Sequence, residues 1–142
     1  MTTRAQLSEQ AEHEGSHTEL MRASLEGQIE TVKALLRSGA NVNEKDEEGR
    51  TALMFAVTNL QTDCAKALLE HGADANVKAK DGSTALILAA SSGDSGMVQE
   101  LLSRGADVSA RVTQTGKTAL MLAKEKGYND IVQLLVGAGA GQ

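Results

Sequence analysis

The segment Gly49-Arg50-Thr51-Ala52-Leu53-Met54-Phe55-Ala56 decides the fold of this chain, because near copies of it recur on both sides. Two copies follow it and one degraded copy precedes it: residues 82–89, 116–123 and 16–23. The threonines of the four copies are Thr18, Thr51, Thr84 and Thr118, which gives steps of 33, 33 and 34 residues. A fixed step of this length indicates an array of structural repeats.

A second marker keeps the same period. It is a Gly-Ala pair preceded by an apolar pair such as Leu35-Leu36, and it occurs at Gly39-Ala40, Gly72-Ala73, Gly105-Ala106 and Gly139-Ala140. Two independent markers that share one period strengthen the assignment, because each repeat of such an array is one supersecondary unit.

The period, the Thr-x-Leu-x-x-Ala opening and the Leu-Leu-x-x-Gly-Ala close resemble the ankyrin repeat over roughly residues 13 to 140. The family's usual Thr-Pro-Leu-His is Thr-Ala-Leu-Met at 51–54 and 118–121, and the chain has no proline. The resemblance implies an all-α solenoid of stacked helix-turn-helix units with β-hairpin loops. We divide the chain into an N-terminal tail or short capping helix at 1–12 and four repeats at about 13–45, 46–78, 79–112 and 113–140.

Composition restricts the core and the classes of partner. The hydrophobic content is 41%, with one Phe, one Tyr and no Trp, so Leu, Ala, Val and Met must form the core. The net charge of −5 disfavours a nucleic-acid surface, which needs basic residues and aromatic platforms. A single cysteine excludes an internal disulfide, and no apolar leader or run of 18 apolar residues is present. We expect a soluble cytoplasmic monomer that binds neither nucleic acid nor membrane.

Each repeat is predicted to contain two helices. The threonine hydroxyl caps the first helix, and apolar pairs three residues apart, such as Leu53 and Ala56, mark its packed face. Glycine then allows a turn with positive φ in three repeats: Gly27, Gly93 and Gly127. The second repeat has Leu60 at this position, and we expect the preceding Asn59 to adopt the left-handed conformation instead.

The second helix of each repeat carries an apolar set at helical spacing, and the Gly of each Gly-Ala pair ends it. These sets are Val32, Leu35, Leu36; Ala65, Leu68, Leu69; Val98, Leu101, Leu102; and Val132, Leu135, Val136. The polar segments between repeats have turn-forming compositions, and by resemblance they are β-hairpin fingers. We name them the first finger (residues 41–50), the second finger (74–83) and the third finger (107–117), and the third is one residue longer.

The two ends of the chain differ in character. In the first 15 residues, Leu7 and Ala11 lie four apart, so this segment is either a frayed tail or a short helix that covers the first repeat. In the last repeat, Lys124 replaces the Ala90 of the repeat before it, and a charge there would be costly under another repeat. We therefore expect a polar cap and a complete array.

No catalytic residue, cofactor or metal site is predicted. His13 and His17 have the spacing of a helical metal pair, but no third ligand accompanies them, so solvated histidines are the preferred interpretation. Cys64 is expected to be a packed thiol. The acidic run Glu44, Asp46, Glu47 and Glu48 is interpreted as a solvated loop tip rather than a cation site.

One position of the repeat carries methionine in three repeats and isoleucine in the remaining one. Its residues are Met21, Met54, Ile87 and Met121. A methionine ladder can form a pliant binding strip, but filling gaps in a core is the commoner use of methionine, and we prefer that interpretation.

The resemblance implies a non-catalytic protein-protein interaction module that holds another protein by its finger tips and concave helical face. Alternatives are a regulatory or inhibitory protein that masks its partner's functional surface, a ligand- or metal-binding protein on a repeat scaffold, and a structural spacer. The positions that match the family's contact residues are Glu47, Glu48, Arg50, Thr58, Asn59, Lys80, Asp81, Ser83, Ser91, Ser92, Gln114, Thr115, Lys117, Glu125 and Lys126. The net charges of the three fingers are −2, 0 and +1, so a partner is expected to carry the opposite gradient.

Overall fold

The computed structural model describes residues 18–140, which contain eight helices and no β-strand. The chain divides between Ala73 and Asp74 into two compact units. The helices of the first unit are α2 (Glu19–Glu26), α3 (Ile29–Arg37), α4 (Ala52–Thr58) and α5 (Thr62–Glu70). Those of the second unit are α6 (Ala85–Ser92), α7 (Ser95–Ser103), α8 (Ala119–Lys126) and α9 (Asn129–Gly137).

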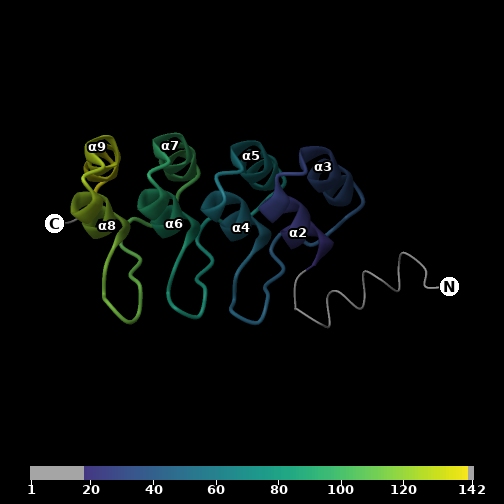
Figure 1. Ribbon diagram of the computed structural model, residues 1–142, viewed down its shortest axis with the longest axis horizontal. Helices are drawn as coiled ribbons and strands as arrows, with labels where there is room; N and C mark the ends of the chain where they lie inside the picture. The colour runs from purple at the N-terminus through teal and green to yellow at the C-terminus, as the bar shows by residue number, and fades with distance from the viewer. Residues whose placement is uncertain (1–17, 141–142) are drawn as a thin grey trace. The chain divides into compact units, whose positions relative to one another are not determined.

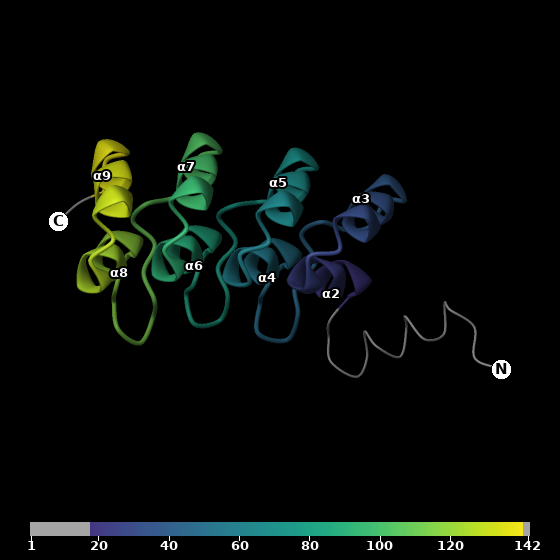
Figure 2. The ribbon, with the colours of Figure 1, turned by 45° about the horizontal axis from the view of Figure 1, so that its top comes forward.

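Each unit contains two helix-turn-helix repeats that pack side by side. In the first unit α2 lies against α4 and α3 lies against α5, so the first helices and the second helices form separate layers (Figure 1). The second unit repeats this arrangement with α6 against α8 and α7 against α9. The turned view shows the same pairing in both units, with the fingers extending from the side of the first helices (Figure 2). The predicted all-α fold of helix-turn-helix units is confirmed.

The four period-marking threonines begin the first helices. Each has extended backbone and its hydroxyl accepts a hydrogen bond from the backbone N–H three residues later. The distances are 3.1 Å for Thr18 and Met21, 3.4 Å for Thr51 and Met54, 3.3 Å for Thr84 and Ile87, and 3.2 Å for Thr118 and Met121. The predicted caps are confirmed, because the side chain satisfies an amide that the helix leaves unpaired.

The turn between the two helices of the second repeat corrects one prediction. Leu60 has φ of 59°, whereas Asn59 has φ of −95°. In the other repeats glycine has the same conformation, as at Gly27 with φ of 76°. The register of the repeat fixes the left-handed residue, and leucine occupies it although asparagine would adopt it more readily. The side chain of Asn59 instead makes a hydrogen bond to the first repeat, which is described below.

The core consists mainly of aliphatic and methionine side chains, as predicted, and also contains Phe55 and Cys64. Leu53, Leu68, Leu86, Leu101 and Leu120 are each 1% exposed or less. At the methionine position, Met21, Met54 and Ile87 are buried and Met121 is half-buried, which agrees with a packing role. At the first apolar position of the second helices, Val32, Ala65 and Val98 are fully buried, whereas Val132 in α9 is half-buried. Val136, at the last position of the α9 set, is exposed.

The three fingers are hairpin turns without strands. In the first finger the N–H of Asp46 donates to the carbonyl of Arg50 at 2.9 Å, and in the second the N–H of Ala79 donates to the carbonyl of Ser83 at 2.9 Å. The third finger closes from Val112 to Lys117, also at 2.9 Å, and so encloses one residue more, as predicted. The β part of the predicted β-hairpin is not formed, because one closing bond per turn does not make a ladder.

Candidate binding surface

Most of the residues predicted to contact a partner are exposed. The exceptions are Ser91 and Lys117, which are half-buried, and Ser83, which is buried. The exposed residues of the first unit are Glu47, Glu48, Arg50, Thr58 and Asn59. Those of the second unit are Lys80, Asp81, Ser92, Gln114, Thr115, Glu125 and Lys126. The structure thus places two groups, one on each unit, on the fingers and at the ends of the first helices.

Asp46 fixes the shape of the first finger. One carboxylate oxygen accepts hydrogen bonds from the backbone N–H groups of Glu48 at 2.9 Å and Arg50 at 2.8 Å. The other oxygen accepts from Nε of Arg50 at 2.9 Å. The side chain is 2% exposed, so Asp46 is a buried structural residue and its interpretation as part of a solvated tip was wrong. The missed signal is a short acidic side chain two residues before another turn residue, which is typical of Asx turns.

The pKa of Asp46 reflects these contacts. Burial alone would raise it, but the hydrogen bonds from the Arg50 backbone and guanidinium and from Glu48 outweigh burial and hold the pKa below its ordinary value. Asp46 is therefore ionised and forms an internal ion pair with Arg50. Glu47 and Glu48 remain exposed at the tip of a turn that this pair holds in place.

Arg50 connects the finger to helix α4. Its guanidinium carbon lies 4.9 Å from the centre of the Phe55 ring, within the range of a cation–π contact. The same guanidinium binds Asp46, so two contacts orient the side chain. Arg50 is exposed but contributes to the structure, and only part of it is available to a partner.

The second finger contains a similar but smaller turn. The carboxylate of Asp81 accepts from the N–H of Ser83 at 2.9 Å and from its hydroxyl at 3.0 Å. These bonds turn Ser83 inward, so only 9% of it is exposed, and its role as a contact residue stays a prediction. The carbonyl of Asp81 accepts from the N–H of Thr113 at 2.8 Å, which joins the second and third fingers.

The third finger carries basic side chains that are themselves engaged. Nζ of Lys117 lies 2.8 Å from a carboxylate oxygen of Glu125, and both side chains are predicted contact residues. Nη1 of Arg111 donates to the carbonyl of Gly116 at 2.8 Å and closes the loop. Gln114 and Thr115 form the exposed tip between these contacts.

Two predicted contact residues at the ends of first helices also join neighbouring repeats. Asn59 and Lys126 are each eight residues after a capping threonine. Nδ2 of Asn59 donates to the carbonyl of Leu25 at 3.0 Å in the first unit. Nζ of Lys126 donates to the carbonyl of Ser91 at 2.7 Å and to its hydroxyl at 2.9 Å in the second. A hydrogen bond between neighbouring repeats therefore occurs at the same repeat position in both units. Its donor is a side-chain amide in the first unit and an ammonium group in the second.

A pair of asparagines missed by sequence reasoning supports the bases of the fingers. Nδ2 of Asn43 donates to the carbonyl of Gly72 at 3.3 Å, and Nδ2 of Asn76 donates to the carbonyl of Gly105 at 3.1 Å. The Oδ1 of Asn76 also accepts from the N–H of Asp107 at 2.7 Å. Their 33-residue separation was a readable signal, since a polar residue that keeps the repeat period indicates a contact between repeats.

Residues 18–140 contain no group of three or more His, Cys, Asp and Glu side chains that could hold a metal ion. His13 and His17 lie outside these residues, as does the predicted tail or cap at 1–12. Cys64 is 1% exposed, and burial, followed by the charge of Asp63, raises the pKa of its thiol. No helix in this part of the chain has the length and apolarity to cross a membrane.

Comparison with curated proteins finds no match to this chain. The family model described as "Ankyrin repeats (3 copies)" matches residues 20–112 and 72–141, and together the two matches cover most of the chain. They coincide with the helix pairs, capping threonines and fingers of both units. The chain belongs to the ankyrin repeat family.

Proposed function

We propose that this protein is a non-catalytic interaction module that binds another protein through its finger tips and the exposed ends of its first helices. Ankyrin repeats are generally protein-protein interaction modules. The observation that carries the proposal for this chain is the first finger, where Asp46 and Arg50 hold the turn and leave Glu47 and Glu48 exposed. A loop ordered before binding loses less conformational entropy when it binds.

The charges suggest the kind of partner that suits the first unit. Asp46 and Arg50 neutralise each other, so Glu44, Glu47 and Glu48 oppose Lys45 alone and the first finger keeps a net charge of −2. A basic partner segment fits this finger. Complementary charge of this kind mainly raises the association rate and sets orientation.

The third finger is mildly basic. It carries Arg111 and Lys117 against Asp107, a net charge of +1. Lys117 is paired with Glu125, and Arg111 is hydrogen-bonded to the carbonyl of Gly116. The third finger therefore attracts an acidic partner less strongly than its net charge of +1 implies. We therefore place the main electrostatic contribution on the first finger.

The test reverses two charges on that finger. Glu47→Lys with Glu48→Lys should weaken capture of partners from a cell extract, chiefly through slower, salt-sensitive association and without lowering thermal stability. The matched control is Glu30→Lys with Glu70→Lys, the same charge change on exposed positions of α3 and α5 in the same unit. Loss of binding in the control and not in the finger variant would place the partner on the second helices and contradict the proposal.

The proposal also states that the protein has no small-molecule or metal activity. Any ligand that binds the native state alone must raise the melting temperature. A panel of divalent metals and nucleotides should give no shift, and a dose-dependent rise with any of them would contradict a purely protein-binding role.

A further inference from the structure

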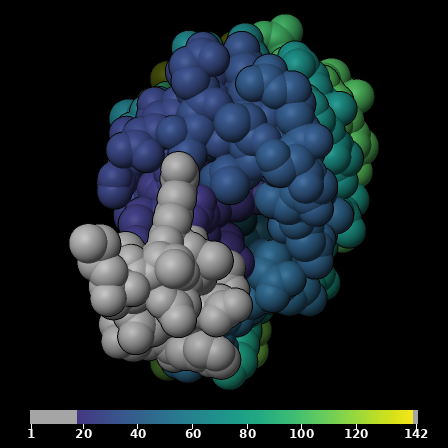
Figure 3. All heavy atoms as spheres, turned by 90° about the vertical axis from the view of Figure 1, so that its right-hand side faces the viewer, coloured from purple at the N-terminus to yellow at the C-terminus, as the bar shows by residue number. Residues whose placement is uncertain are grey.

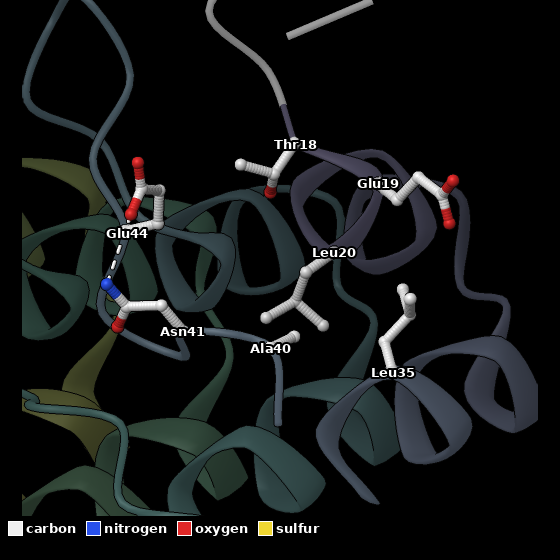
Figure 4. A pocket seen from close by; sticks show the side chains of 7 residues that line it. All are labelled: Thr18, Glu19, Leu20, Leu35, Ala40, Asn41 and Glu44. Atoms are coloured by element: carbon white, nitrogen blue, oxygen red, sulfur yellow. Dashed lines mark hydrogen bonds between the residues drawn. The ribbon is translucent and has the colours of Figure 1, made fainter. Parts of the chain in front are cut away.

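A cavity opens at the N-terminal end of the first unit. Its volume is about 400 Å³, and its lining residues are Thr18, Glu19, Leu20, Leu35, Ala40, Asn41 and Glu44. The side chains of Leu20, Ala40 and Leu35 lie together in the middle, with Asn41 and Glu44 on one side and Glu19 on the other (Figure 4). The space-filling view shows this end of the unit, where purple atoms from the start of the described chain lie beside blue atoms from further along it (Figure 3).

The cavity exists because the first repeat has no repeat before it within the described residues. Leu35 is half-buried, whereas Leu68, at the same position one repeat later, is completely buried. Leu101 and Leu135, at the same position in the second unit, are also completely buried. Leu35 thus keeps apolar surface in contact with water, whereas the leucines at the same position of the other repeats are buried. Covering this surface of Leu35 is favourable.

The chemistry of the cavity defines what fits it. The floor is aliphatic, from Leu20, Leu35 and Ala40, and the rim carries the carboxylates of Glu19 and Glu44. Glu44 is held in place by the side-chain amide of Asn41 at 3.1 Å. An occupant with one medium-sized aliphatic side chain and a nearby cation satisfies both parts.

We propose that residues 4–11 of the same chain occupy this cavity, with Leu7 on the aliphatic floor and Arg4 at the acidic rim. The sequence supplies both groups three residues apart, and a further small apolar residue, Ala11, follows Leu7 by four residues. The other charge of the segment, Glu9, follows Leu7, so Arg4 is the charged residue on the N-terminal side of Leu7.

The reach of the chain permits this contact. Thr18 itself lines the cavity, and Leu7 precedes it by 11 residues. A connection of this length spans roughly 16 Å as a helix and roughly 36 Å when extended. Because the segment is tethered at the rim, its effective concentration is far above that of a free partner, which favours the chain's own segment over a second molecule.

Cysteine cross-linking in the full chain tests the proposal. Leu7→Cys is combined with Ala40→Cys in the cavity, or with Lys33→Cys as control. Lys33 is exposed and lies two residues from Leu35 on α3, about 200° around the helix. The native Cys64 is buried and does not compete. Under mild oxidation of dilute protein, peptide mapping should show the intrachain 7–40 disulfide forming at least about tenfold faster than 7–33.

Equal rates for the two pairs would overturn the proposal. Predominant interchain disulfides at position 40 would overturn it in favour of a second copy as the occupant. A separate measurement uses Leu7→Asp, which should lower the melting temperature by about 2 to 4 °C, against Gln6→Asp, which should leave it unchanged. Equal melting temperatures for both variants would contradict the contact even if a disulfide can be forced. Both readouts are independent of partner binding at the fingers.

Discussion

A Cβ atom at Gly82 would stand 2.5 Å from the carbonyl oxygen of Arg111 and 2.9 Å from the backbone nitrogen of Thr113. The backbones of the second and third fingers therefore approach each other at Gly82, where the second finger has no side chain. The hydrogen bond from the N–H of Thr113 to the carbonyl of Asp81, at 2.8 Å, holds them there. Gly116 has the equivalent place in the third finger, and a Cβ there would meet nothing within 4 Å.

The first prediction compares these two glycines. Both have positive φ, 87° at Gly82 and 70° at Gly116, so alanine should cost each about 1 to 2 kcal/mol. Gly82→Ala must also displace backbone atoms, which adds on the order of 1 to 3 kcal/mol. Chemical denaturation should give a lower free energy of unfolding for Gly82→Ala than for Gly116→Ala. Equal losses would mean that the two fingers do not lie in contact.

The second prediction concerns Leu60, which combines a positive φ with a side chain that is 57% exposed. Leu60→Gly removes the backbone strain and loses little burial, so it should raise the free energy of unfolding by about 1 kcal/mol. Asn59→Gly is the control, because it removes the bond to the Leu25 carbonyl from a residue with ordinary φ and should destabilise the protein. A stabilising Asn59→Gly with a neutral Leu60→Gly would reverse the assignment.

The third prediction follows from the lowered pKa of Asp46. A carboxyl with a depressed folded-state pKa contributes stability above its unfolded value of about 3.9, and this contribution is lost as the pH falls through the folded pKa. Asp46→Asn keeps one acceptor but loses the charge, so it should cost on the order of 1.5 to 3 kcal/mol at neutral pH. Unfolding curves from about pH 7 to about pH 2 should show the gap between wild type and variant closing below about pH 4. A gap that stays constant with pH would show that the charge of Asp46 is not responsible.

The fourth prediction tests the core of each unit. Leu53 and Leu86 are each 1% exposed, so Leu53→Ala and Leu86→Ala should each cost about 2 to 5 kcal/mol. Leu60→Ala is the matched control, since the same atoms are removed from an exposed site, and it should change stability by less than about 1 kcal/mol. If all three variants lost similar amounts, the packing of the two core leucines would not be what stabilises the units.

The sequence alone determined the features that depend on residues close together in the chain. A capping threonine bonds an amide only three residues later, so Thr18, Thr51, Thr84 and Thr118 could be assigned in advance from the apolar helical pattern that follows each of them. Glycine after the first helix, as at Gly27, and the extra residue of the third finger were equally readable. The repeat period then gave the packed positions, because every repeat must bury the same face.

The tertiary structure decided what the side chains at the ends of helices and in the fingers contact. Asn59 and Lys126 reach carbonyls 34 and 35 residues earlier, and no local pattern shows that a polar side chain spans to the next repeat. Ser83 was predicted to face a partner, but the Asp81 carboxylate turns it inward. Asp46 differs from Glu47 beside it only by one methylene, yet the closure of the turn buries one and exposes the other. The positions of Asp46 and Ser83 depend on how a single finger closes. The contacts of Asn59 and Lys126 exist only once neighbouring repeats have docked, because local backbone preferences act over three or four residues.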